Sequence, residues 1–229
     1  MEPYAGAAGP RIETIERLEL SEGPEGALAI RVTYGGITDL LISSTGHPDQ
    51  TIVADGVTMR GKMGFVRTED GVVRSMYLIG GTLLSAGGVA LTGIGTIRGE
   101  ITSTKRKANG DPYNGFVTCT PIGAAAADAM RGAYVVVTHP DESTNGYRIR
   151  ETIGDSGSTV IVFDEYDPGF EIRPDGTSIM SYYPAKRWNG THTFTFDGIS
   201  VYDSRSPQPE SEPEPVHQQA GKAPHSVQH

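Results

Sequence analysis

The sequence has almost no cysteine and no long apolar run, and each absence excludes a class of protein. Cys119 is the only cysteine, so neither a disulfide framework nor a cysteine-based zinc site can form within one chain. We expect Cys119 to be a small buried residue. No stretch approaches the roughly 20 apolar residues of a membrane-spanning helix, which predicts no membrane partner. The N-terminus, MEPYAGAAGPRIE, lacks the basic and apolar regions of a secretory signal, so the compartment stays unknown.

Basic residues are also scarce, with 19 Lys and Arg against 28 Asp and Glu and a formal net charge of −9. Nucleic-acid-binding domains usually carry a basic excess that replaces counterions on the phosphates, so we predict no nucleic-acid partner. The clearest local basic cluster is Lys105, Arg106 and Lys107. Because Asn-Gly and Asp-Pro follow it, we interpret this cluster as a solvated strand end that enters a turn.

Large apolar residues are missing from the C-terminal segment, residues 204–229 (SRSPQPESEPEPVHQQAGKAPHSVQH). Ordering such a segment costs backbone entropy with little apolar burial to offset it, so we expect a disordered tail after a β domain at residues 1–203. Three of the six histidines, His217, His225 and His229, lie in this tail. Their wide spacing does not indicate a metal site.

The remaining chain contains short β-branched runs separated by turn residues, with 30 glycines and 15 prolines in the whole sequence. This pattern predicts an all-β fold, an antiparallel two-sheet β-sandwich with one continuous core. Asp70-Gly71 has the composition of a tight hairpin turn, and the alanine-rich residues 123–130 are the one predicted helical turn. The predicted strands cover residues 11–20, 27–34, 39–43, 64–68, 72–79, 82–85, 89–91, 95–105, 115–120, 133–138, 146–153, 159–163, 178–183 and 191–196.

The polar residues do not form a recognisable catalytic motif. His47 and His139 each begin a His-Pro-Asp segment, which is the composition of an ordinary turn. His192 alternates with threonines, so its face depends on strand register. The carboxylates of FDEYDPGF, Asp164, Glu165 and Asp167, suit a turn better than paired acid and base chemistry. We predict no catalytic residue, metal ligand or cofactor from these patterns.

One short patch has the composition of a ligand-binding surface. Aromatic faces stack on sugar rings, and cationic side chains pair with carboxylates or sulfates. An acidic saccharide is therefore the predicted ligand, although core packing with cationic side chains extended to solvent explains the same residues. The candidate residues are Tyr182, Tyr183, Lys186, Arg187 and Trp188.

The order of several segments is recognisable over most of residues 38–196. It resembles the C-terminal β-sandwich portion of heparinase II/III-like polysaccharide lyases. The segments are Thr38-Asp39-Leu40-Leu41-Ile42-Ser43, Asp55-Gly56, Gly64-Phe65-Val66-Arg67, Asp70-Gly71-Val72-Val73, Gly80-Gly81-Thr82-Leu83-Leu84, Arg131-Gly132 before Tyr134-Val135-Val136-Val137, Gly146-Tyr147-Arg148-Ile149, Asp167-Pro168-Gly169-Phe170 and Tyr182-Tyr183-Pro184.

This resemblance implies a β-sandwich that works beside an α/α-toroid domain or partner chain. Such lyases cleave uronic-acid-containing polysaccharides by β-elimination, and the toroid supplies the catalytic Tyr and His. The present chain has no toroid, and His47-Pro48-Asp49 falls too late to match the His-x-Asp hairpin of the family. We therefore transfer no catalytic residue and expect the chain alone to be inactive, and extracytoplasmic if the parent lyase is secreted. The alternative is a free-standing saccharide-binding or structural β-sandwich module.

Overall fold

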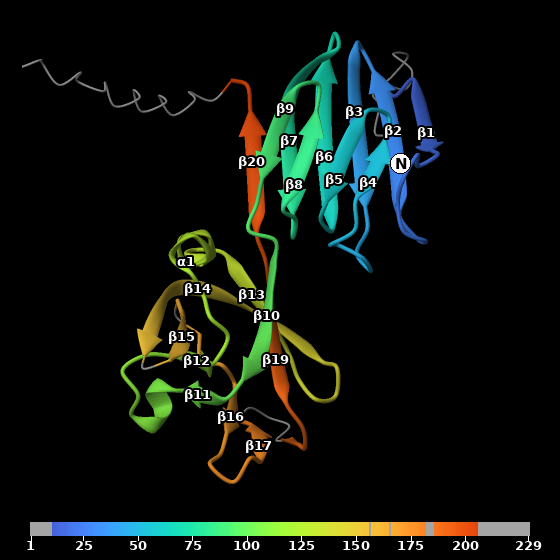
Figure 1. Ribbon diagram of the computed structural model, residues 1–229. Coiled ribbons are helices and arrows are strands. Elements are labelled where there is room, and N and C mark those ends of the chain that lie inside the picture. The colour runs from blue at the N-terminus through green and yellow to red at the C-terminus, as the bar shows by residue number, and fades with distance from the viewer. Residues whose placement is uncertain (1–10, 156, 165, 182–185, 206–229) are drawn as a thin grey trace, which may run out of the picture.

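The computed structural model describes residues 11–155, 157–164, 166–181 and 186–205 (Figure 1). Strands dominate, and every strand pairing in the described part is antiparallel, which confirms the predicted all-β class. The described helical segments are α1 (Ala124–Met130) and the 3₁₀ turn η2 (Lys107–Asn109). None of the described helices is long and apolar enough to cross a membrane. The predicted tail lies outside the described residues from position 206.

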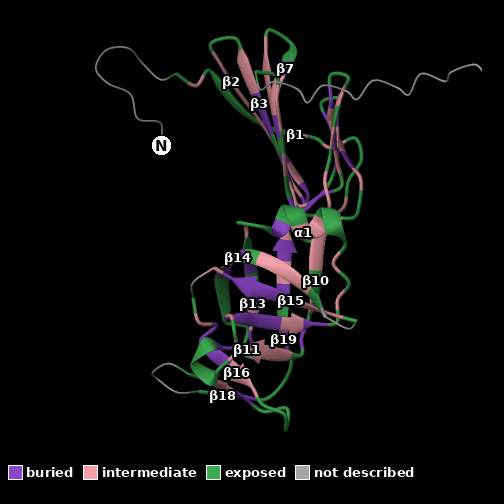
Figure 2. Cartoon of the chain, turned by 90° about the vertical axis from the view of Figure 1, so that its left-hand side faces the viewer, coloured by how far each residue is buried: buried purple, intermediate pink, exposed green. Residues whose placement is uncertain are grey.

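Two sheets face each other in what we call the first lobe. Figure 2 views these two layers nearly edge-on. The six-stranded sheet has the order β1 (Thr14–Leu18), β2 (Leu28–Tyr34), β3 (Ile37–Ser43), β6 (Met63–Glu69), β7 (Val72–Ile79) and β20 (Ile199–Asp203). The four-stranded sheet has the order β4 (Ile52–Ala54), β5 (Val57–Arg60), β8 (Leu83–Ala86) and β9 (Val89–Thr92).

The second lobe contains a seven-stranded sheet and a three-stranded sheet. The larger sheet has the order β10 (Thr96–Ile101), β19 (His192–Asp197), β13 (Tyr134–Thr138), β14 (Thr144–Asp155), β15 (Ser158–Phe163), β12 (Gly115–Thr118) and β11 (Ser103–Lys105). The smaller sheet consists of β16 (Phe170–Ile172), β17 (Ser178–Met180) and β18 (Arg187–Trp188).

The seven-stranded sheet bends over its own core. Its long strand β14 shifts register between Ile149 and Glu151, where it changes partner from β13 to β15, and such bulges bend a strand and increase its twist. As a result Phe116 on β12 and Phe194 on β19 contact each other, with ring centroids 5.2 Å apart, although three strands separate them in the sheet order. The aromatic side chains of both ends therefore fill one interior.

The buried apolar residues form two clusters, one in each lobe, where the sequence predicted a single continuous core. Ile42 and Leu78 of the six-stranded sheet pack with Met59 and Leu84 of the four-stranded sheet. The second cluster is richer in aromatic residues and includes the single tryptophan, Trp188. Alternation along a strand indicates which of its residues share a face, but it carries no information about which sheets face each other.

The chain crosses between the lobes twice, between β9 and β10 and between β19 and β20 (Figure 1). Backbone hydrogen bonds join the two crossings, because Gly198 N donates to Gly95 O (3.0 Å) and Gly80 N donates to Gly198 O (2.8 Å). Asp197 adds a side-chain link, since its carboxylate accepts from Thr96 Oγ1 at 2.7 Å and pairs with Lys62. The second lobe is thus inserted between two strands of the first.

Local predictions met mixed outcomes. Asp70 and Gly71 both have positive φ (50° and 78°), which confirms the tight hairpin. The prediction that Cys119 is buried was wrong: it follows the end of β12 and is exposed, because the alternate position Thr118 points inward. The turn after Lys105 is present, but Arg106 is buried and bonded to Asp167 rather than solvated.

Candidate functional site

Two buried histidines meet in the second lobe, next to the three-stranded sheet. His139 directly follows β13, and His192 begins β19. These strands pair with Thr138 opposite Thr193, which brings the two histidines together although 53 positions separate them. Their Nδ1 atoms lie 2.8 Å apart, a hydrogen-bond distance that requires one ring to donate and the other to accept.

The outer nitrogens of the two rings extend this contact into a chain of hydrogen bonds. Asn145 Nδ2 donates to His139 Nε2 at 2.7 Å, so His139 carries its proton on Nδ1 and donates to His192. His192 then carries its proton on Nε2 and donates to Ser178 Oγ at 2.7 Å, and Ser178 donates to the carbonyl of Trp188. With donors and acceptors in this order, every hydrogen bond of the chain has one donor and one acceptor, and both imidazoles are neutral.

Aromatic rings enclose the pair. Trp188 stacks on His139 (centroids 4.7 Å apart, 11° between planes), and Phe170 stacks on His192 (4.8 Å, 18°). Burial lowers the pKa of His139, and burial together with the neighbouring His139 lowers the pKa of His192 to about 4. The pair is therefore uncharged at neutral pH and acts as a packed polar cluster.

Asp141 fixes the far edge of Trp188. Its carboxylate accepts from Trp188 Nε1 at 2.8 Å and from Ser143 Oγ at 2.7 Å, and it pairs with the ammonium of Lys186. The bond from Lys186 is the largest of several that hold the pKa of Asp141 far below its usual range. The indole is consequently bonded at its nitrogen and stacked on its face.

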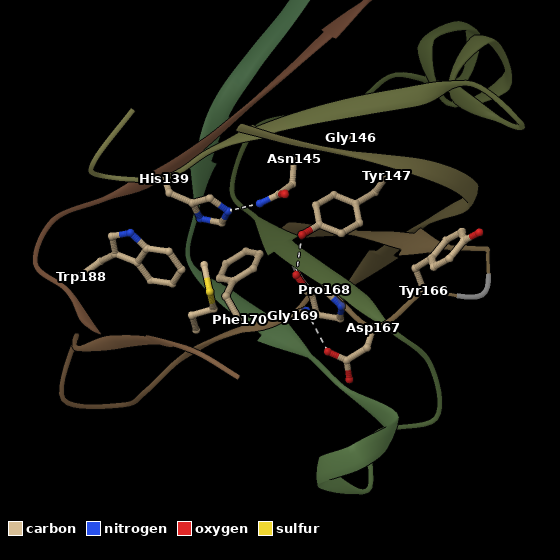
Figure 3. A pocket seen from close by; sticks show the side chains of 11 residues that line it. His139, Asn145, Gly146, Tyr147, Tyr166, Asp167, Pro168, Gly169, Phe170 and Trp188 are labelled. Atoms are coloured by element: carbon tan, nitrogen blue, oxygen red, sulfur yellow. Dashed lines mark hydrogen bonds between the residues drawn. The ribbon is translucent and has the colours of Figure 1, made fainter. Parts of the chain in front are cut away.

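A pocket of about 440 Å³ opens beside this cluster (Figure 3). Tyr147, Phe170, Met180 and Trp188 supply much of its apolar lining, and Asn145, Tyr166 and Asp167 supply polar groups. The Asp167 carboxylate accepts from Arg106 Nε at 3.0 Å and from Gly169 N at 2.8 Å. The Tyr147 hydroxyl donates to the carbonyl of Pro168, which ties β14 to the loop that precedes β16.

The structure describes three of the five residues of the predicted ligand patch. Tyr182 and Tyr183 lie outside the described residues, while Lys186 and Arg187 are exposed at the start of β18. Trp188 is only 3% exposed and reaches the pocket with part of its ring. The prediction that these residues bind a saccharide stays a prediction.

Sequence reasoning missed the cluster itself. His139 was interpreted as a turn residue and His192 as a strand residue of unknown face, and only the pairing of β13 with β19 shows that they meet. His47 is exposed in a turn, as its composition indicated. Within the described ranges no three His, Cys, Asp or Glu residues are grouped so that they could hold a metal ion.

Comparison of the chain with protein-family models, with curated proteins and with solved structures found no match.

Proposed function

We propose that this chain is the β part of a polysaccharide lyase similar to the heparinase II/III-like enzymes, and that it docks on a helical catalytic partner through the outer face of its six-stranded sheet. The observation that carries the proposal is an apolar row across that face. Ile30, Leu41, Phe65, Tyr77 and Val201 lie directly opposite one another on five consecutive strands.

The row is accessible in the described structure. Leu41, Tyr77 and Val201 are 41%, 43% and 53% exposed. Met63 and Ile199, which flank it two residues along their strands, are 43% and 64% exposed. The outer face of an antiparallel sheet is usually polar, and contiguous exposed apolar residues mark interaction surfaces.

A helical partner is the occupant that best fits this surface. The two terminal segments outside the described residues, 1–10 and 206–229, contain few large apolar side chains that could cover the row. Beside the row, Arg67 is already paired with Asp39 at 2.7 Å, so the face does not present an unpaired charge there. Sheets bury an apolar face against another layer, most often helices or a second sheet. We choose helices because the lyases that the sequence resembles pair their β-sandwich with a helical toroid.

In this proposal the reaction belongs to the partner. β-Elimination needs a base for the C5 proton and a group that neutralises the adjacent carboxylate, both held in position. The β part would complete the interface along which the polysaccharide lies, and we expect the isolated chain not to produce unsaturated uronate.

The test is reconstitution with a candidate partner, namely any all-helical protein that the neighbouring reading frame encodes. The two proteins are co-expressed, their complex is measured by size exclusion with light scattering, and turnover of acidic glycans is followed at the absorbance of unsaturated uronate. The variant Tyr77→Ser/Val201→Ser should weaken the complex at least tenfold. The matched control Tyr134→Ser/Val136→Ser changes two comparably exposed residues of β13 in the second lobe and should leave it intact.

Three results would contradict the proposal. Turnover by this chain alone would place a complete active site within it. If none of the tested helical proteins binds the chain, the outer face of the six-stranded sheet does not dock a helical partner. Self-association that the Tyr77→Ser/Val201→Ser variant abolishes would assign the face to a second copy of the chain.

The alternative, a free-standing saccharide-binding module, has one specific observation in its favour, which is the aromatic pocket that reaches the edge of Trp188. A screen of the isolated chain against oligosaccharides by calorimetry tests it directly. Binding without any helical partner would support it.

A further inference from the structure

We infer that the pocket between β14 and the loop before β16 binds an uncharged sugar unit, with the Tyr166 ring as its stacking surface and Asn145 Oδ1 as an oriented acceptor for a sugar hydroxyl. The inference rests on the saccharide-binding alternative and is independent of docking to a helical partner. It places the ligand beside the patch predicted from the sequence rather than on Lys186 and Arg187.

The size and lining of the pocket suit a small polyhydroxylated ligand. Its volume of about 440 Å³ falls in the range of roughly 300–1,000 Å³ found for small-molecule sites. Such sites combine an apolar lining with a few placed polar groups. Tyr166 is 70% exposed, so its ring offers a free face, whereas Trp188 is enclosed by His139 and bonded to Asp141.

Asn145 is held in one orientation by the histidine pair. Its Nδ2 donates to His139 Nε2, so Oδ1 is the end of the amide that remains for a ligand, and no described residue donates to it. Figure 3 shows Asn145 and Tyr166 on either side of the Tyr147 ring. His139 and His192 are positioning residues here, because they act on the ligand only through the amide of Asn145.

The charges of the pocket favour a neutral ligand. Asp167 is the only charged residue among the described lining residues, and its carboxylate is held by Arg106. Of the cations near the pocket, Arg106 is bonded to Asp167 and Lys186 is paired with Asp141. A uronate would therefore bring a second carboxylate next to Asp167 without a free cation in the described lining, which disfavours it.

The experiment compares neutral and acidic hexasaccharides by calorimetry with the full chain. Cellohexaose, maltohexaose and mannohexaose are the neutral probes, and hexagalacturonate and hexamannuronate are the acidic ones. Tyr166→Ala and Asn145→Ala should each weaken binding of a neutral probe about three- to tenfold, the loss expected for one hydrogen bond or one stacking contact.

Matched controls separate the site from general effects. Tyr134→Ala removes a tyrosine of comparable exposure (65%) on β13, and Asn109→Ala removes an exposed asparagine in η2; neither lines the pocket. Both should bind as the unchanged chain does. Tyr166→Ala, at a 70% exposed ring, should keep the unfolding midpoint of the unchanged chain, whereas Asn145→Ala also removes the hydrogen bond to buried His139 and should lower it.

Each other outcome overturns a stated part of the inference. Binding of acidic probes alone would overturn the neutral ligand. Binding that resists Tyr166→Ala and Asn145→Ala but is lost in Lys186→Ala/Arg187→Ala would move the site to the sequence-predicted patch while the binding function stands. Absence of binding by every probe at millimolar concentration would reject the site and the saccharide-binding alternative together.

Discussion

The ammonium of Lys62 lies 2.7 Å from the carboxylate of Asp197, a residue 135 positions later in the chain. Lys62 belongs to the first lobe and Asp197 ends β19 in the second, so this pair bridges the two cores. Both side chains are less than one-third exposed, which makes the pair less screened than a surface ion pair.

Weakening this bridge should loosen the coupling between the lobes. Asp197→Asn removes the charge and is expected to lower the free energy of unfolding by about 1–2 kcal/mol, as for a part-buried charged hydrogen bond. Fluorescence of the single tryptophan, Trp188, reports the second lobe, and far-ultraviolet circular dichroism reports both. The two urea midpoints should separate in the variant.

The control is Arg150→Met, which breaks an exposed pair with Glu151 inside β14. Its expected effect is within about 0.5 kcal/mol. Coincident transitions in Asp197→Asn, with stability unchanged, would show that the backbone crossings alone hold the lobes together.

Acid should destabilise the chain through the histidine pair. The pKa of His192 is about 4 in the folded chain and near 6.5 when unfolded, so the unfolded state binds more protons as pH falls between these values. The stability is present above pH 6.5 and is lost progressively toward pH 4, by about 2–3 kcal/mol. The charged groups that face the pair are Asp141 and Lys186.

Urea unfolding at a series of pH values checks this dependence. His192→Gln should flatten the loss between pH 6.5 and 4, whereas His47→Gln, at an exposed turn position, should leave it unchanged. Equal slopes in all three proteins would mean that the histidine pair does not control the acid response.

A methyl group at position 115 should be poorly tolerated. A Cβ on Gly115 would lie 2.2 Å from the carbonyl oxygen of Ile161, a backbone atom that cannot rotate away. We expect Gly115→Ala to cost about 1–3 kcal/mol or more, as other overpacked sites do. The control Gly154→Ala, also in a strand, meets no atom within 4 Å and should change stability by less than about 1 kcal/mol. Similar unfolding midpoints for the two variants would contradict this packing.

Removal of Asp141 should release the indole of Trp188. The variant Asp141→Ala leaves Trp188 Nε1 without its acceptor and Lys186 without its carboxylate. We expect a red-shifted tryptophan emission and a lower thermal midpoint. Asp128→Ala, in the exposed part of α1, is the matched control. An unchanged emission spectrum in Asp141→Ala would show that stacking on His139 alone fixes the ring.

The sequence predicted elements where the signal is local. Residues 72–79 were predicted as a strand with the bounds that β7 has, and the Asp70-Gly71 turn was predicted from its composition. β20 (Ile199–Asp203) was not predicted, although it is no shorter than several strands that were; its partner β7 lies more than a hundred residues earlier. Pairing over such a distance leaves little trace in a single run of residues.

The candidate site could not be predicted for the same reason, because it depends on which distant strands pair. His139 and Asn145 are six positions apart, but the cluster also needs His192 and Ser178, which arrive on two other strands. Each residue has an ordinary local setting. The apolar row across the six-stranded sheet was equally hidden, because Leu41, Tyr77 and Val201 align only once the strand order is known.

The insertion of the second lobe has a consequence for synthesis on the ribosome. The edge of β7 that pairs with β20 stays open until residue 199 has emerged, after about a hundred further residues have been translated. During that interval the nascent chain exposes an unpaired strand edge next to an apolar face, a combination that attracts other strands. The six-stranded sheet of the first lobe therefore gains its last strand only after the whole second lobe has been synthesised.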